Sequence, residues 1–208
     1  MLEERVVAIL TGNVERKSII DAVAKLDVPD CWIAGGFVRN PVWDALFEVK
    51  EDTPMNDVDV VYFKPLNSYG IPQESIIALL QCGEPNSIWA EEERLQKELE
   101  AQFPGLEFEV KNQARMYLSP VKTVKDPPYV SLSDAVAAWV ETATATGIRS
   151  IGNGKYEVLV PYGLQDLFAG VIRPTRAIFE ERARERMEQK RWRTLWPKLR
   201  FESANDSA

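Results

Sequence analysis

The sequence predicts an α+β fold, and three observations support this prediction. Several long stretches repeat apolar residues at helical spacing, while shorter runs are uniformly apolar or alternate apolar with polar residues, as strands do. The two kinds of segment follow one another irregularly and do not form a regular strand–helix–strand repeat. The GxGxxG and GxxxxGK[ST] motifs are both absent from the sequence, so the Rossmann and P-loop folds lack their signatures.

The first quarter of the chain predicts two helices, a strand and a third helix. Residues 3–11 have the periodicity of a short helix, and residues 18–26 that of an amphipathic helix. Cys31–Ala34 is a short apolar run that ends at two glycines, which is typical of a buried strand. The next helix spans Phe37–Phe47, and we expect it to tolerate Pro41 because that residue lies in its first turn.

The middle of the chain predicts two more strands separated by helices. A polar loop at residues 48–56 precedes a strand at Val58–Phe63, and a loop at 64–72 follows it. Helices are expected at Gln73–Leu80 and Ile88–Phe103. Leu106–Val110 alternates strictly and therefore predicts a third strand.

The last third predicts a helix, a hairpin and two further helices. The predicted segments are a helix at 131–139, a hairpin at 147–160 that turns at residues 152–154, a short helix at 163–171 and a long helix at 174–196. Trp192 and Trp196, together with Leu199, form an apolar stripe that would dock the last helix on the core. We expect one domain over residues 1–208, with its core at about 15–172 and a helical extension at about 173–200.

The chain contains no histidine, and this excludes several reaction classes. Ser-His-Asp and Cys-His catalysis and the usual His-rich zinc hydrolases all need a residue that is missing. Any catalysis by this chain must then use carboxylates, Lys, Arg, Tyr or a hard cation such as Mg²⁺ or Mn²⁺. The two cysteines lack metal-like spacing, and neither a signal peptide nor a membrane span is expected, so a cytoplasmic location is the default.

Charge is distributed unevenly along the chain. The formal net charge of −7 argues against a large nucleic-acid footprint. Residues 173–200 are nevertheless locally basic, with about ten basic and four acidic residues. Two interpretations stay open: a solvated helix face of Glu–Arg pairs, or a surface that contacts phosphate or RNA.

A glycine pair and an Asp-x-Asp pair are the candidate phosphate-binding and metal-binding motifs. Gly35 and Gly36 lie between a strand and a helix, where backbone N–H groups and the helix N-terminus can approach a phosphate, and Arg39 lies one turn on. Asp57 and Asp59 are two residues apart on a predicted strand, so they share one face. Two such carboxylates suit hard cations, and a glutamate on the 106–110 strand would complete a three-acid site if that strand lay alongside.

These motifs resemble a known family. Trp32–Asn40 and Asn56–Val61 resemble the head domain of tRNA CCA-adding enzymes, within the DNA polymerase β-like nucleotidyltransferase superfamily. Glu109–Met116, Glu141–Ala145 and Pro161–Phe168 resemble more closely a family of small bacterial nucleotidyltransferase-like proteins. The resemblance covers about residues 15–200, and it implies a polymerase β-like fold with a mixed sheet flanked by helices and a C-terminal helical segment.

The resemblance also implies the site residues. Gly35, Gly36 and Arg39 match the phosphate-binding glycine motif, and Asp57 and Asp59 match the metal-binding acids. Glu109, rather than Glu107 on the same strand face, matches the third catalytic and metal-binding carboxylate. Lys111 and Arg115 are further candidates for nucleotide binding, with ion pairs to acids as the equal alternative.

The implied activity is Mg²⁺- or Mn²⁺-dependent transfer of an NMP group from an NTP. The acceptor, which could be a small molecule, a protein or RNA, is left open by the sequence, as are the preferred NTP and the oligomeric state. CCA addition is not expected, because Asn40 stands where CCA-adding enzymes have Asp, residues 48–56 form an inserted loop, and the neck, body and tail domains are missing. The alternative function is an inactive nucleotidyltransferase-like module that binds a nucleotide or a partner.

Overall fold

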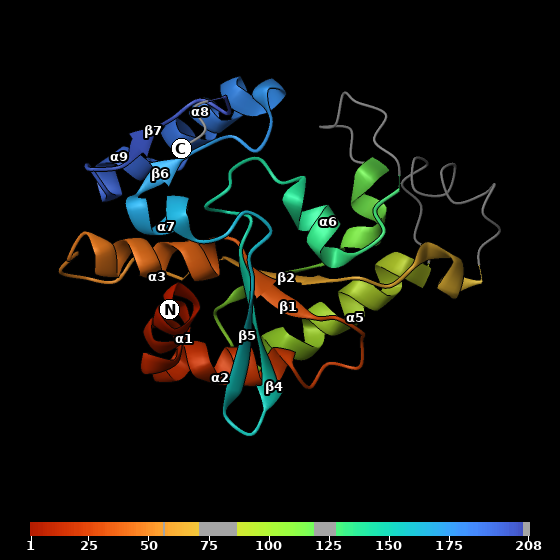
Figure 1. Cartoon of the computed structure of the whole chain (residues 1–208). Helices are drawn as coiled ribbons and strands as arrows, with labels where there is room; N and C mark the ends of the chain where they lie inside the picture. The colour runs from red at the N-terminus through yellow and green to blue at the C-terminus, as the bar shows by residue number, and fades with distance from the viewer. Residues whose placement is uncertain (56, 71–86, 119–127, 206–208) are drawn as a thin grey trace.

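The computed structural model describes residues 1–55, 57–70, 87–118 and 128–205, and it confirms the α+β prediction (Figure 1). The helix expected at Gln73–Leu80 lies outside these residues. The strands are β1 (Trp32–Ala34), β2 (Asp57–Tyr62), β3 (Glu107–Asn112), β4 (Gly147–Gly152), β5 (Lys155–Leu159), β6 (Val171–Ile172) and β7 (Arg200–Phe201). The helices are α1 (Leu2–Gly12), α2 (Val14–Val23), α3 (Gly36–Leu46), α5 (Ser87–Gln102), α6 (Leu132–Ala137), α7 (Gln165–Ala169), α8 (Glu180–Gln189) and α9 (Trp192–Leu195), with 3₁₀ turns at Leu66–Tyr69, Gln113–Leu118 and Ala177–Phe179.

Five strands form one mixed sheet in the order β3-β2-β1-β4-β5. The β2 and β3 strands are parallel, whereas β1 pairs antiparallel with both β2 and β4. Helix α5 packs on β3, and α3 packs on β1 and β2. The register aligns Ala34 with Asp59 and Asp59 with Glu109. The sheet therefore brings the end of the glycine-motif strand and two of the predicted acids to adjacent positions.

The hairpin predicted at residues 147–160 is confirmed, whereas several helix boundaries differ from the prediction, most of all the start of α2. Helix α2 begins at Val14, four residues earlier than predicted, because the Asn13 side chain caps it by accepting from the Arg16 N–H at 3.0 Å. Pro41 is the sixth residue of α3 and so lies in its second turn, not in the first as predicted. Proline has no N–H, so α3 lacks one internal hydrogen bond at that point.

The single long helix predicted at 174–196 is wrong. The segment instead forms a 3₁₀ turn, α8 and α9, and it ends in β7, which pairs parallel with β6. Arg191 breaks the helix by adopting a left-handed backbone with φ of 53°. The break turns α9 so that Trp192 and Trp196 pack edge-on against Trp43 of α3 at centroid distances of 5.6 and 5.0 Å. The apolar stripe predicted for this segment does dock on the core, through Trp192 of α9 and through Trp196 and Leu199 after the end of that helix.

One cluster of buried apolar residues joins the N-terminal helices, the sheet and the C-terminal segment. It includes Leu10 of α1, Val60 of β2 and Trp196 at the C-cap of α9, each completely buried. The C-terminal segment is thereby held on the same core as the glycine-motif helix. None of the helices in the described ranges is long and apolar enough to cross a bilayer.

Candidate active site

Gly35 is required by a close approach between the glycine motif and Asp59. It lies at the junction of β1 and α3 with φ of 66° and ψ of −127°, a conformation that side chains disfavour. A Cβ at this position would lie 2.8 Å from Asp59 Oδ2. The Gly35 N–H is used by the fold, since it donates to the Thr146 carbonyl at 3.0 Å. No side chain caps the start of α3, and its first two residues, Gly36 and Phe37, line a cavity.

Gly35→Ala is expected to impair the site more than the fold. Backbone strain should destabilise the protein by about 1–3 kcal/mol, and displacement of the Asp59 carboxylate should reduce nucleotidyl transfer by roughly 10²-fold. Gly70→Ala is the matched control, because Gly70 has φ of 68° but a Cβ there would meet no atom of the described chain within 4 Å. Urea denaturation and transfer assays on both variants test this. Equal activity losses in the two variants would contradict the proposed close approach.

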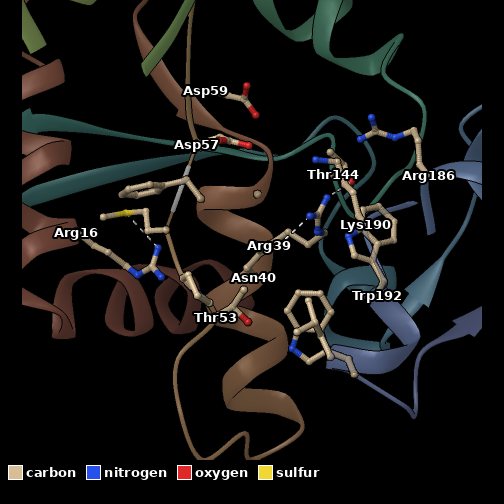
Figure 2. Close-up of a pocket in the computed structure, with 16 residues that line it drawn as sticks. Arg16, Arg39, Asn40, Thr53, Asp57, Asp59, Thr144, Arg186, Lys190 and Trp192 are labelled. Atoms are coloured by element: carbon tan, nitrogen blue, oxygen red, sulfur yellow. Dashed lines mark hydrogen bonds between the residues drawn. The ribbon is translucent and has the colours of Figure 1, made fainter. Parts of the chain in front are cut away.

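Asp57 and Asp59 lie together on one wall of a cavity of about 240 Å³ (Figure 2). Asp57 is exposed and Asp59 partly buried, and both come from the start of β2, as the strand periodicity predicted. Burial raises the pKa of Asp59 to about 6, and the negative charge of Glu109 adds to this rise. An acid held in this way is stabilised by any cation that binds beside it.

Glu109 lies beside Asp59 in the parallel β2–β3 pair. Its carboxylate forms an ion pair with Lys111, with Nζ and Oε1 3.1 Å apart. Among the side chains that the structure describes, no group of three Asp, Glu, Cys or His residues has the spacing of a metal site. The carboxylate oxygens of Asp57, Asp59 and Glu109 are nevertheless hard donors of the kind that Mg²⁺ or Mn²⁺ prefers. The assignment of these three residues as metal ligands stays a prediction.

Arg39 lies in the wall opposite the two aspartates (Figure 2). It is almost fully buried, and its guanidinium lies 4.2 Å from the ring centroid of Trp192 and 5.1 Å from that of Trp43. It donates to Thr144 Oγ1 at 2.7 Å and to Asn40 Oδ1 at 2.9 Å. Burial lowers the pKa of Arg39 to about 10, so it still carries its charge at neutral pH. Two hydrogen bonds and two tryptophan rings thus hold this cation next to Gly36 of the glycine motif.

Three further cations line the same cavity, and the sequence prediction did not name them. They are Arg16 of α2, Arg186 of α8 and Lys190 at the end of α8. Lys190 is close enough to Asp59 to lower the pKa of that carboxyl. The locally basic composition of residues 173–200 was the available signal, but it could not show which two side chains turn inward. In the structure Arg186 and Lys190 line the cavity, whereas Arg182 of the same segment pairs with Glu185, so both interpretations of this segment stay predictions.

The last two predicted nucleotide-binding residues are each paired with an acid. Arg115 forms two hydrogen bonds of 2.8 Å with Glu92 of α5, and it lines neither cavity that contains Asp59. Lys111 pairs with Glu109 but does line the second of these cavities. The ion-pair alternative is therefore the one observed for Arg115, and we leave this residue out of the proposed nucleotide site.

A second cavity of about 340 Å³ meets the first at Asp59, Thr144 and Arg186. Glu109 and Lys111 lie in its wall, together with the apolar side chains of α6 and its neighbours. Asp59 thus stands between a cavity rich in cations and one with largely apolar walls. This arrangement offers separate binding regions on two sides of one carboxylate.

Comparisons with known proteins agree with the fold. The profile of a family described as nucleotidyltransferase matches residues 21–201. An NMR structure described as a CCA-adding enzyme head domain is 26% identical, with a TM-score of 0.72 over 97% of this chain and 96% of that one. No curated protein matches the chain.

Two complete CCA-adding enzyme structures are more distant. The complex with CTP is 13% identical with a TM-score of 0.50, and the complex with ATP is 14% identical with a TM-score of 0.51. Each match covers 96% of this chain but only 43% and 42% of the enzymes. The chain therefore spans less than half the length of these enzymes, and the likeness to them shows the fold alone.

Proposed function

The chain belongs to the nucleotidyltransferase family, and we propose that it is a metal-dependent enzyme that moves an NMP group from an NTP to an acceptor. The observation that supports this most directly is that one cavity is lined by both acidic and basic side chains. Asp57 and Asp59 line one side, while Arg16, Arg39, Arg186 and Lys190 surround the rest. A triphosphate with bound cations needs both kinds of wall at once.

The cationic side of the cavity would bind the triphosphate. The N-terminus of α3, where Gly36 and Phe37 line this cavity, would present backbone N–H groups and a positive dipole end to it. Arg186 and Lys190 add charges that neutralise the leaving pyrophosphate. The CTP and ATP complexes of CCA-adding enzymes support an NTP as the ligand class.

The acidic side would hold the metal and the acceptor. Asp57 and Asp59 are the proposed ligands, with Glu109 as the third, and Mg²⁺ or Mn²⁺ would neutralise phosphate charge there. Glu109 would also take the acceptor proton, and its position next to Asp59 in the sheet supports this role. The acceptor oxygen or nitrogen then bonds to the α-phosphorus, the α–β phosphoanhydride bond breaks, and pyrophosphate leaves with that electron pair.

The test is incubation of the protein with each α-labelled NTP, Mg²⁺ or Mn²⁺, and a cell extract separated into RNA, protein and small molecules. We expect label in one fraction and equimolar pyrophosphate, both abolished by EDTA and restored by added metal. Thermal stabilisation by an NTP with no pyrophosphate release in any fraction would instead support an inactive binding module.

Lys190→Ala is expected to raise the KM for the NTP about fivefold while changing kcat less than twofold. An exposed charge contact to a phosphate is worth about 1 kcal/mol, which is about fivefold in affinity. Steady-state kinetics at low ionic strength measure the effect. Lys198→Ala is the control, because Lys198 is an exposed lysine of the same segment that lines neither cavity. An unchanged KM in Lys190→Ala would remove this residue from the site.

A further inference from the structure

The second cavity points to a class of acceptor. We propose that the acceptor is a small molecule with a flat apolar body, a hydroxyl group and an amino group, bound in the 340 Å³ cavity with its amino group on Glu141. This inference rests on the proposed nucleotidyl transfer. It names the substrate class, which neither the family match nor the fold supplies.

The geometry of the reaction assigns the acceptor to the second cavity. In-line displacement at the α-phosphorus needs the attacking atom and the leaving pyrophosphate on opposite sides. The cation-rich cavity is the natural place for the pyrophosphate, and the second cavity meets it at Asp59, Thr144 and Arg186. A hydroxyl in the second cavity would thus reach the phosphorus past Asp59, on the side where Glu109 lies.

The walls of the second cavity favour a flat apolar body. Its volume of about 340 Å³ suits a small molecule. Its apolar lining consists of Val61, Met116, Ala135, Ala138, Trp139, Val140 and Phe179. Trp139 Nε1–H donates to Gln113 Oε1 at 3.3 Å, which orients the indole. The same ring lies 3.5 Å from where a Cβ on Gly35 would be, so it reaches the catalytic end of the cavity.

Glu141 supplies the polar contact. Its side chain is 1% exposed and lines the cavity, and Oε1 accepts from Arg186 Nε at 2.7 Å. Within the described part of the chain, Oε2 has no hydrogen-bond partner. A buried carboxylate oxygen without a donor is costly, so a donor from the ligand is expected there.

The charges around the cavity favour an amine over an anion. Asp59, Glu109 and Glu141 line it, against Lys111 and Arg186. Since Asp59 and Glu109 are the proposed metal ligands, Glu141 is the acid of this lining that is left for an amine. Both of these cations already pair with an acid of the same cavity, Lys111 with Glu109 and Arg186 with Glu141. Lys111 is thus engaged by an acid, and Arg186 is assigned to the pyrophosphate in the first cavity, so neither is left for the phosphates of an RNA acceptor. The net charge of the chain is −7, which also argues against an RNA acceptor.

The test compares three aryl probes that differ only in the group at the end of a short chain. Tyramine carries an amine, 4-ethylphenol carries none, and 4-hydroxyphenylacetate carries a carboxylate. Their dissociation constants are measured by ligand-observed NMR with the full chain. We expect tyramine to bind at least tenfold more tightly than 4-hydroxyphenylacetate, and an excess of ATP with Mg²⁺ to leave tyramine bound.

Glu141→Gln is the deciding variant. It keeps the shape and the bond from Arg186, but it presents an amide where Oε2 stood. Tyramine affinity should fall at least tenfold, while 4-ethylphenol affinity changes less than twofold. Trp139→Ala should weaken all three probes, and Glu107→Gln, an exposed acid of β3 outside the cavity, should weaken none. Melting temperatures of the variants identify any loss of folding, and Trp139→Ala then decides whether the probes occupy this cavity.

Failure of this inference and failure of the proposed function give different results. Equal binding of tyramine and 4-hydroxyphenylacetate, or tyramine affinity unaffected by Glu141→Gln, overturns the amine site. Label that enters only the RNA or protein fraction overturns the small-molecule acceptor but leaves nucleotidyl transfer intact. Glu141-dependent tyramine binding without NTP turnover in any fraction overturns the transferase and leaves an amine-binding site.

Discussion

Asp59→Asn is expected to reduce nucleotidyl transfer by at least about 10²–10³-fold, the loss usual for removing a group that stabilises transition-state charge. Asp59 lines both cavities and lies beside Glu109, so it is the acid shared by the donor and acceptor regions. Asparagine keeps the shape but lacks the charge that binds a hard cation. The measurement is single-turnover transfer from an α-labelled NTP at saturating Mg²⁺.

The fold of the Asp59→Asn variant should survive. Burial raises the pKa of Asp59, which means that the ionised carboxylate destabilises the folded protein. The neutral amide removes this cost, so without metal the variant should melt no lower than the wild type. Glu107→Gln provides the control for loss of an exposed acid near the site. Full transfer activity in Asp59→Asn would rule out the proposed mechanism.

Trp43→Ala is expected to lower the free energy of unfolding by about 3–5 kcal/mol. Trp43 is completely buried, and its Nε1–H donates to the Leu167 carbonyl at 3.1 Å. It also packs edge-on against Trp192 and Trp196. The substitution would remove the hydrogen bond and both ring contacts together, and it would leave a cavity between α3 and the C-terminal segment.

Urea denaturation of Trp43→Ala measures the effect, with Ile178→Ala as the control. Ile178 is 57% exposed, so its truncation should change stability by less than about 0.5 kcal/mol. Because Arg39 also stacks over the Trp43 ring, Trp43→Ala should weaken NTP binding as well. A stability loss near that of Ile178→Ala would mean that α9 does not depend on this packing.

The two variants test separate parts of the molecule. Asp59→Asn tests the chemistry of the site with the fold kept, and Trp43→Ala tests how the C-terminal segment is attached to the glycine-motif helix. Lys190 lies on that segment, so its place in the cavity depends on the packing of Trp192 and Trp196 against Trp43. The fold and the proposed nucleotide site are coupled through these tryptophans.

Sequence by itself determined the local features of this protein. Strand periodicity placed Asp57 and Asp59 on one face, and both line one wall of the same cavity. The Gly152-Asn153-Gly154 turn also follows from local chemistry, as does the start of α6, where Ser131 Oγ accepts from the Asp134 N–H at 3.1 Å. The family resemblance singled out Glu109 over Glu107, a choice that periodicity alone could not make.

Only the tertiary structure decided which distant residues meet. A helix continuing to 196 satisfies local propensity, but burying Trp192 and Trp196 against Trp43 releases more free energy than one continued turn, so the chain breaks at Arg191. That break accompanies the approach of Lys190 to Asp59. The pairing of Arg115 with Glu92, and of Glu141 with Arg186 beside the second cavity, likewise joins residues 23 and 45 positions apart. Contacts at such separations depend on how the whole core packs, which no short window of sequence contains.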